Sequence, residues 1–183
     1  MTELIIVRHG ETFENESGIC QGQTEGTLSE EGKKQNKLLA KYLRNYKIHK
    51  IYSSPLIRAV ETGIEIWKYH KNIKLQKDIR LIEWNMGVLQ GQKFPYEFDI
   101  SKPVGGIENI KLVRMRVRDF LDEILLLHNN QTILLISHGL TIKVLTTILM
   151  NISVENIYNI ALMKNSCFSV YNTDNNQDFK LKK

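Results

Sequence analysis

The sequence predicts an α/β fold, a three-layer α/β/α sandwich in which a mostly parallel central sheet carries helices on both faces. Segments with strand patterns alternate with segments of helical periodicity along most of the chain. Two short segments, 4–7 and 132–137, consist mainly of apolar residues, as expected for strands buried on both faces. No repeat, low-complexity segment or Pro/Gly-rich linker divides the chain, which favours one domain over residues 1–183.

Strands and helices alternate in the first half of the chain. The predicted elements are a strand at 4–7, a helix at 28–46, a strand at 50–53 and a helix at 57–69. In the first helix, Leu38, Leu39 and Leu43 recur at helical spacing. Ser29 and Glu30 suit its first turn, where free N–H groups favour polar and acidic side chains.

The second half contains a long irregular segment before the pattern resumes. The predicted elements are a short strand at 81–83, a loop at 85–106, a helix at 107–127, a strand at 132–137, a helix at 140–150 and strands at 167–172 and 179–181. The segment from Trp84 through the loop is rich in aromatic residues. These side chains either pack over the core or form a lid or apolar substrate wall, and we leave both interpretations open.

The composition is that of a folded domain outside membranes. Apolar residues make up 42% of the 183 residues and charged residues 25%, and no apolar run approaches the roughly 20 residues that span a bilayer. The N-terminal run lacks the features of a signal peptide, and Cys20 and Cys167 lack metal-site or redox spacing. We therefore expect reduced thiols, a cytoplasmic location and no membrane contact.

The net charge of +5 has two interpretations. Clustered basic residues could contact nucleic acid, or they could lie on solvated helix faces and a lysine-rich C-terminal tail. We favour the second interpretation and expect no nucleic-acid partner, because no nucleic-acid-binding motif accompanies the charge. A positive field would still steer an anionic substrate toward a pocket.

Three segments follow predicted strands at the place where α/β sheets bind ligands, beyond the carboxyl ends of the strands. Arg8 and His9 follow the first strand, and a Ser-Ser-Pro turn leads from the second strand to Arg58. His138 follows the strand at 132–137. Distant parts of the chain therefore deliver two histidines and two arginines to one edge of the sheet.

These side chains suit the binding and transfer of a phosphate group. Arg8 and Arg58 can clamp its oxygens with charged, planar donors, and Gly139 allows the backbone to approach. Either His9 or His138 could attack phosphorus, because imidazole is partly unprotonated near neutral pH. No Walker A loop and no carboxylate cluster is present in the sequence, so we expect no metal and no cofactor.

A phosphoryl transfer also needs an acid that protonates the leaving group. The sequence offers Glu11, Glu83 and Glu108 as candidates. Glu83 ends the predicted strand at 81–83 and could reach the same sheet edge, so the chemistry favours it slightly. The alternative without a catalytic role is that Glu11 and Glu108 are ordinary loop or helix carboxylates.

The same residues belong to an ordered series of motifs that resembles the histidine phosphatase superfamily, also called the phosphoglycerate mutase-like family. The series runs from residue 5 to about residue 145, and its order makes the set far more specific than any single motif. Its members are Arg8-His9-Gly10-Glu11-Thr12, Asn15, Gln21-Gly22, the segments 28–35 and 52–62, Leu81-Ile82-Glu83, Gly105-Gly106-Ile107-Glu108 and Ser137-His138-Gly139.

The resemblance implies a role for each matched residue. His9 would be the nucleophile that forms a phosphohistidine, and Glu83 would protonate the leaving group and then help to activate water. Arg8, Arg58 and His138 would hold the phosphoryl group during transfer. The positions implied in phosphate or substrate binding are Arg8, Asn15, Gln21, Gly22, Arg58, His138 and Gly139. The family needs no metal.

Some positions depart from the family pattern, and none belongs to the predicted chemical centre. The departures are Glu25 for the usual Asp, Thr27 for the usual Pro, the extra residue Ile107, Asn109 for Ser, and Leu89-Gln90 for an aromatic-acidic pair. They bring substrate contacts into question and leave the expected chemistry unchanged.

We expect a phosphatase that hydrolyses small phosphomonoesters such as α-ribazole phosphate, phosphoserine or a sugar phosphate. The alternative enzyme is a phosphoglycerate mutase, which would need a basic insertion after the general acid. Residues 92–106 contain only Lys93 and Lys102 as cations, so phosphatase is favoured. An alternative of another class is a catalytically silent protein that binds a phosphorylated ligand. A homodimer would be typical of small members of the family.

Overall fold

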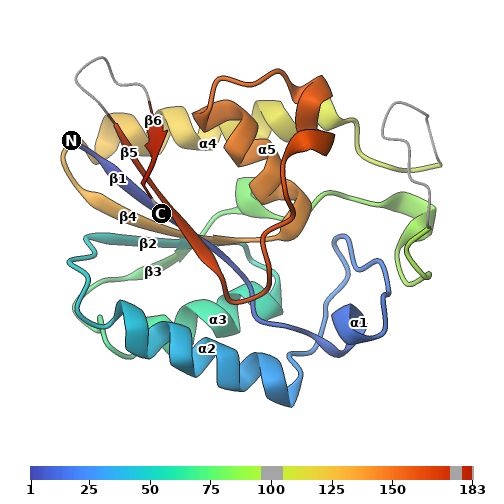
Figure 1. The fold of residues 1–183 in the computed structure, drawn as a ribbon, viewed down its shortest axis with the longest axis horizontal. Coiled ribbons are helices and arrows are strands. Elements are labelled where there is room, and N and C mark those ends of the chain that lie inside the picture. The colour runs from blue at the N-terminus through green and yellow to red at the C-terminus, as the bar shows by residue number, and fades with distance from the viewer. Residues whose placement is uncertain (96–104, 174–178, 183) are drawn as a thin grey trace.

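The computed structural model describes residues 1–95, 105–173 and 179–182, which include a six-stranded sheet of order β3-β2-β4-β1-β5-β6. The strands are β1 (Glu3–Arg8), β2 (Lys50–Ser53), β3 (Leu75–Lys77), β4 (Thr132–Ser137), β5 (Phe168–Thr173) and β6 (Phe179–Leu181). The four strands β1 to β4 run parallel, whereas β5 pairs antiparallel with β1 and β6 pairs antiparallel with β5 (Figure 1). The predicted, mostly parallel α/β sheet is confirmed.

Helices cover both faces of this sheet (Figure 1). On one face lie α2 (Glu30–Leu43) and α3 (Ile57–Trp67), and on the other lie α4 (Ile110–Leu127) and α5 (Gly139–Leu149). In β1, Ile5 packs in the α2–α3 core and Leu4 in the α4–α5 core. Since successive side chains of a strand point to opposite faces, the apolar runs fill two cores at once.

Side-chain caps explain where several helices begin. The Ser29 hydroxyl accepts a hydrogen bond from Gly32 N at 3.1 Å at the start of α2, and Asn109 Oδ1 accepts one from Lys111 N at 2.8 Å at the start of α4. A short helix that the sequence analysis did not foresee, α1 (Phe13–Glu16), begins with a capping box between Thr12 and Asn15. Local caps therefore set the boundaries that periodicity leaves open.

The structure corrects several predicted elements. The strand expected at 81–83 is wrong, because Asp78 caps a 3₁₀ turn, η1 (Ile79–Leu81), and the third strand lies earlier, at β3. The helix expected from residue 107 begins only at Ile110, after the Asn109 cap. Two further 3₁₀ segments, η2 (Gly87–Leu89) and η3 (Val154–Asn159), were not predicted. Residues 96–104 of the predicted loop lie outside the described residues.

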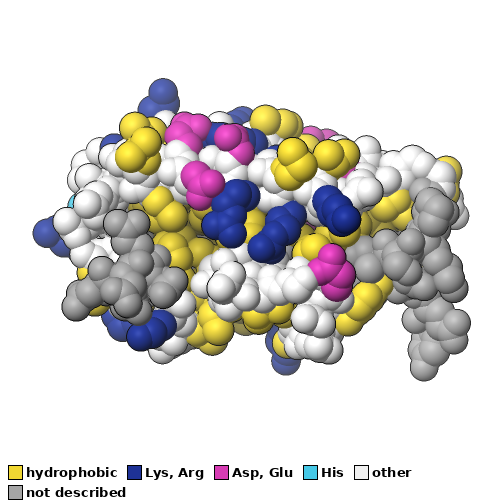
Figure 2. All heavy atoms as spheres, turned by 90° about the horizontal axis from the view of Figure 1, so that it is seen from above, with side chains coloured by type: hydrophobic (Ala, Val, Ile, Leu, Met, Phe, Trp, Pro, Cys, Tyr) yellow, Lys and Arg dark blue, Asp and Glu magenta, His cyan; other side chains and the backbone are white. Residues whose placement is uncertain are grey.

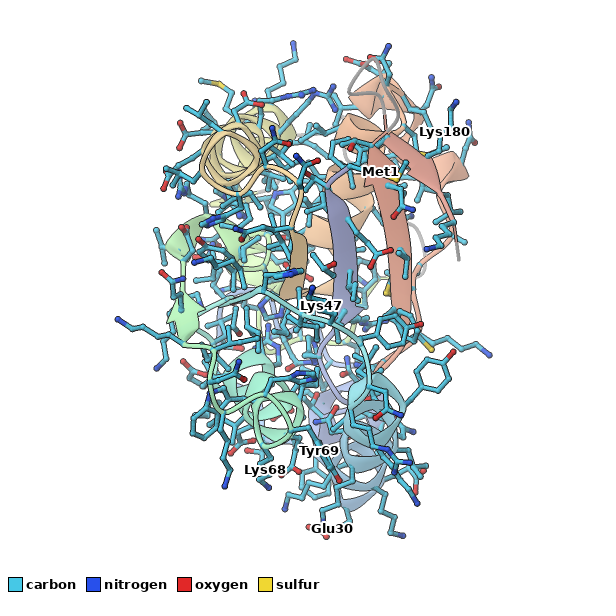
Figure 3. The ribbon with its side chains drawn as sticks, turned by 90° about the vertical axis from the view of Figure 1, so that its left-hand side faces the viewer. Met1, Glu30, Lys47, Lys68, Tyr69 and Lys180 are labelled. Atoms are coloured by element: carbon cyan, nitrogen blue, oxygen red, sulfur yellow. The ribbon has the colours of Figure 1, made fainter. Side chains whose placement is uncertain are left out.

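The register of the parallel strands places their carboxyl ends together. Arg8 of β1 lies beside Ser137 of β4, and Ser53 of β2 lies beside Ile136. Figure 3 views the molecule from the opposite end, where Met1 and Lys47 precede β1 and β2. The segments that follow β1, β2 and β4 therefore emerge at one end of the sheet.

The outer face of α4 and α5 carries cations among apolar side chains (Figure 2). Lys111 and Arg118 of α4 are exposed, and Arg118 faces Asp122 at 3.9 Å. At this separation on an exposed surface an ion pair contributes little to stability, and these charges are solvated. Among the described residues, no helix combines the length and the apolar character that a membrane crossing requires.

Candidate active site

The ends of β1 and β4 bring the two predicted histidines together. Because Arg8 and Ser137 are register partners, the residues that follow them leave the sheet side by side. The ring centroids of His9 and His138 lie 5.0 Å apart, with the ring planes inclined at 55°. Two segments separated by more than a hundred residues thus form the floor of one site.

A hydrogen bond to the backbone orients the buried ring of His9. Its Nδ1 lies 2.7 Å from the Gly10 carbonyl oxygen. A carbonyl oxygen can only accept, so Nδ1 carries the proton and Nε2 keeps its lone pair. Burial, and then the charges of Arg58 and Arg8, lower the pKa of His9 well below its ordinary value of 6.5. The ring is therefore neutral at neutral pH, with Nε2 unprotonated.

Arg58 lies in the first turn of α3 and is 1% exposed. Its Nε donates to His9 Nε2 at 3.3 Å, and its two terminal nitrogens donate to the carbonyl oxygens of Thr24 at 2.7 Å and Gly22 at 2.8 Å. Gly22 has a φ of +53°, and a Cβ there would lie 2.3 Å from Gln90 Oε1. Glycine is required at this position so that the loop can hold the guanidinium group.

Arg8 ends β1 and reaches the site from the other side. One terminal nitrogen donates to the Met163 carbonyl oxygen at 2.6 Å, and its Nε is buried with no hydrogen-bond partner among the described residues. A Cβ at Gly139 would lie 3.5 Å from the Arg8 guanidinium carbon and 2.9 Å from Leu162. The absence of a side chain at Gly139 therefore leaves room for Arg8.

His138 begins α5 and is fully buried behind the site. Its Nε2 lies 2.7 Å from the Ser54 hydroxyl, and its Nδ1 has no partner among the described residues. Burial, followed by the charges of Arg58, His9 and Arg8, lowers the pKa of His138 well below 6.5. In this structure His138 does not line the cavity described below, so its contact with phosphate stays a prediction.

Glu83 reaches the site from the segment that follows η1, and its two oxygens have different partners. Oε1 accepts from Trp84 N at 2.8 Å, Thr141 N at 3.0 Å and the Thr141 hydroxyl at 2.9 Å. Among the described residues, Oε2 accepts only from Leu140 N, at 3.2 Å. Oε1 is therefore fixed at the N-terminus of α5, whereas Oε2 keeps capacity for a proton or a substrate atom.

Glu108, another candidate acid, has a structural partner. Its carboxylate receives Arg116 Nε at 3.0 Å and a second guanidinium nitrogen at 3.2 Å. Arg116 also donates to the carbonyl oxygens of Arg80 at 2.7 Å and Ile82 at 2.8 Å. The pair holds the backbone that leads to Glu83, and Glu108 does not line the cavity.

These groups surround a cavity of about 380 Å³, the catalytic cavity. The predicted site residues that line it are Arg8, His9, Asn15, Gln21, Gly22, Arg58, Glu83 and Gly139. Glu11 lines it as well. A larger groove of about 760 Å³ adjoins it and shares Arg8, Glu11, Leu162 and Asn165 with it, but neither His9 nor Glu83 lines this groove. The catalytic cavity brings an unprotonated imidazole nitrogen, two guanidinium groups and a carboxylate within one enclosure.

A comparison of the sequence with protein families agrees with this geometry. A model of the histidine phosphatase superfamily (branch 1) matches residues 4–183. The chain belongs to this superfamily. A curated relative, phosphoserine phosphatase 1 of Hydrogenobacter thermophilus, is 33% identical over an alignment that covers 100% of this chain and 92% of the relative. The metal-independent phosphoserine phosphatase of Arabidopsis thaliana is 32% identical over 76% of this chain and 65% of its own length.

Solved structures share the fold of this histidine phosphatase. Bacillus stearothermophilus YhfR superposes with a TM-score of 0.90 and 23% identity, over 99% of this chain and 95% of YhfR. At this identity the match establishes the fold alone. The family resemblance expected from the ordered motifs is confirmed over the whole chain.

The departures from the family motifs have roles in this histidine phosphatase. Glu25 Oε2 accepts from Ile57 N at 2.8 Å at the start of α3, beside Arg58. Gln90 Oε1 accepts from Gln23 N at 2.8 Å and so ties the Arg58-binding loop to η2. Glu25 and Gln90 therefore contact the elements that position Arg58, and Asn109 caps α4.

Sequence reasoning missed a polar network that holds the segment around His9. The Thr62 hydroxyl accepts from Gly10 N at 2.9 Å and from Asn36 Nδ2 at 3.1 Å, and it donates to the Arg58 carbonyl oxygen at 2.8 Å. Asn165 Nδ2 donates to the His9 carbonyl oxygen at 3.0 Å. Thr62 lies inside a recognised motif and could have been found, whereas nothing in the sequence near Asn165 marks it.

Proposed function

We propose that this histidine phosphatase hydrolyses small phosphomonoesters through a phosphohistidine formed on His9. The observation that carries the proposal is the orientation of His9. Gly10 holds the proton on Nδ1, and the unprotonated Nε2 lies at 3.3 Å from Arg58 inside the catalytic cavity. A neutral imidazole beside two guanidinium groups is arranged to attack a bound phosphate dianion.

In the first step the His9 Nε2 lone pair forms a bond to phosphorus and the bond to the alcohol oxygen breaks. Arg58 releases its contact with His9 Nε2, which frees the lone pair. Arg8 and Arg58 exchange their carbonyl contacts for the phosphoryl oxygens and balance the charge of these oxygens. The leaving oxygen takes a proton from Glu83 Oε2, the carboxylate oxygen with the lighter hydrogen-bond load. The products are an alcohol and a phosphohistidine.

In the second step a water molecule attacks phosphorus and the N–P bond breaks. Glu83, now deprotonated, accepts a proton from the water, and the electron pair of the broken bond returns to His9 Nε2. Inorganic phosphate leaves, and the starting protonation states are restored. The guanidinium groups supply the positive charge throughout, so the step needs no metal, in keeping with the name of the Arabidopsis relative.

Hydrolysis is favoured over isomerisation by the charge of the cavity wall. Among the described residues the only Lys or Arg side chains that line it are Arg8 and Arg58, both required for phosphate. A mutase must also hold its phosphorylated acid by the carboxylate between the two transfers. We therefore place the phosphatase ahead of the phosphoglycerate mutase and of the silent phospho-ligand binder.

The test is turnover of p-nitrophenyl phosphate and of a metabolite panel, scored as inorganic phosphate released, beside isomerisation of 3-phosphoglycerate. We expect phosphate release that is lost in His9→Ala and retained in the matched control His49→Ala, whose ring lies at the opposite end of the sheet by Thr132. Equal inactivity of the native protein and His9→Ala would favour the silent binder.

The partner and location predicted from the sequence complete the proposal. The substrate is a small phosphorylated metabolite, as the names of the relatives support. A single domain, a cytoplasmic location, a homodimer and the lack of nucleic-acid and membrane partners stay predictions from the sequence. Light scattering of the full chain at several concentrations measures the oligomeric state.

A further inference from the structure

The wall of the catalytic cavity carries information about the alcohol that the phosphate is attached to. Its inner end holds His9 and the guanidinium groups of Arg8 and Arg58. The rest of the wall is largely apolar and is lined by Ile19, Cys20, Met86, Phe94, Leu140 and Leu162. Burial, and then the charge of Glu83, raises the pKa of Cys20 to about 11, so this thiol is uncharged at neutral pH.

Arg8 and Arg58 are the cations that line the catalytic cavity in the described part of the chain. A phosphate dianion requires the charges of both Arg8 and Arg58. Lys93 directs its ammonium group to the Ser17 carbonyl oxygen at 2.5 Å, and Lys164 lines the neighbouring groove instead. Within residues 1–95, 105–173 and 179–182, no further Lys or Arg side chain lines the catalytic cavity.

Apart from the groups used in the proposed chemistry, Glu11 is the charged residue that lines the cavity in the described part of the chain. A second anionic group on the substrate would lose water without gaining a cation, and it would face the Glu11 carboxylate. An uncharged or amine-bearing alcohol avoids both the loss of anion hydration and the repulsion between like charges. If it has apolar surface, it also gains contact with the apolar wall.

We propose that the substrate of this histidine phosphatase is a phosphomonoester whose alcohol carries no carboxylate. The proposal rests on the phosphatase activity proposed above and narrows it to one substrate class. Phosphoserine, the substrate in the name of a relative that is 33% identical, carries a carboxylate and falls outside this class.

Two pairs of phosphate esters, each differing in one carboxylate, measure the effect of that carboxylate on turnover. O-phosphoethanolamine is O-phosphoserine without its carboxylate, and glycerol 3-phosphate replaces the carboxylate of 3-phosphoglycerate with a hydroxymethyl group. We expect kcat/KM to be at least about tenfold higher for the carboxylate-free member of each pair, which corresponds to about 1.4 kcal/mol. Where turnover is too slow, inhibition of p-nitrophenyl phosphate hydrolysis gives the same comparison.

A variant with an added cation tests whether the lack of a third cation causes this preference. Leu162 is 53% exposed at the cavity mouth, and Leu126 is 83% exposed on α4. We expect Leu162→Lys to raise the ratio of phosphoserine to phosphoethanolamine kcat/KM about five- to tenfold, because it supplies the missing charge. Leu126→Lys adds the same charge elsewhere and should leave the ratio unchanged.

Equal or faster turnover of the carboxylate-bearing esters would overturn the substrate class while leaving the phosphatase intact. If that preference disappeared in Lys102→Gln, the cation would come from a residue outside the described ranges, and the proposal would be wrong for that reason. If p-nitrophenyl phosphate and all four esters were neither hydrolysed nor bound, the phosphatase proposal itself would fail and this one with it.

Discussion

The two oxygens of Glu83 are the clearest example of how single residues divide the chemistry. Three donors from Trp84 and Thr141 hold Oε1, whereas Oε2 meets a single N–H group of the described residues, at 3.2 Å. One oxygen therefore fixes the position of the side chain, and the other is available for proton transfer. Glu11 lines the same cavity, and within the described ranges its carboxylate has no such anchor.

This division predicts how Glu83→Gln responds to the leaving group. We expect kcat/KM for alkyl phosphates to fall by about 10²–10⁴, since an amide cannot supply the proton. For p-nitrophenyl phosphate the loss should be about tenfold or less, because nitrophenolate leaves without a proton and kcat/KM excludes the later hydrolysis step. Initial rates on both esters give the ratio.

Glu11→Gln is the matched control, because it makes the same chemical change on the same cavity wall. Its losses should not depend on the leaving group. A leaving-group dependence that appeared in Glu11→Gln and was missing in Glu83→Gln would assign the acid to Glu11 instead.

Residues could be predicted from the sequence where a motif and a strand end coincide, as for His9 and Arg58. The structure places both where the carboxyl ends of parallel strands meet. Thr141 and Asn165 could not be found this way, because their contacts to Glu83 and the His9 backbone depend on how separate segments pack. The position of His138 behind the cavity also depends on packing, through its contact with Ser54.

At the scale of elements, α2 supports the nucleophile segment through a very close approach. A Cβ on Gly32 in the first turn of α2 would lie 2.0 Å from the Glu11 carbonyl oxygen. A backbone atom cannot rotate away as a side chain can, so the helix and the segment after His9 require glycine there. Gly63 of α3 offers a contrast, because its nearest atom is the flexible end of Leu75 at 2.8 Å.

This contrast predicts that a Gly→Ala substitution destabilises the protein more at Gly32 than at Gly63. We expect Gly32→Ala to lower the free energy of unfolding by about 2–4 kcal/mol and to reduce kcat. Gly63→Ala should stay within about 1 kcal/mol of the native protein, because the helix propensity of Ala offsets a small shift of Leu75. Urea unfolding of the two variants measures both values, and equal costs would contradict the close approach.

Element types were more predictable than element ends. The apolar runs of β1 and β4 identify buried strands because no other short element is apolar on both faces. The short β3 strand and the η1 turn carry no such signal, since β3 is three residues long and its side chains are half-buried or exposed. Here Asp78 decides the local conformation, through contacts that periodicity does not report.

At the scale of the whole molecule, the buried neutral histidines link the site to stability. The folded-state pKa values of His9 and His138 lie well below 6.5, through burial and then the charge of Arg58. The unfolded chain binds protons at these histidines at a higher pH than the folded protein does. Their contribution to stability is therefore complete above about pH 6.5 and is lost as the pH falls from there toward the folded pKa values.

We accordingly expect the free energy of unfolding to be nearly constant from pH 8 to 7 and to fall below about pH 6.5. His9 and His138 contribute a slope of up to about 3 kcal/mol per pH unit, about 1.4 for each. Burial also lowers the pKa values of His70 and His128, which add to the slope in the same direction. Urea midpoints in phosphate-free buffers measure the slope. His138→Asn, which cannot titrate, should have a shallower slope, and a flat native profile down to pH 5 would contradict buried neutral rings.

Transfer of the phosphoryl group to His9 Nε2 is the step on which the proposed hydrolysis depends. Rapid mixing of the full chain with excess p-nitrophenyl phosphate, an alkaline quench that preserves phosphohistidine, and peptide mass spectrometry test it directly. We predict one phosphoryl group, located on His9 and absent from His9→Ala. A phosphoryl group on His138, one that persists in His9→Ala, or turnover with no phosphorylated protein would contradict the claim.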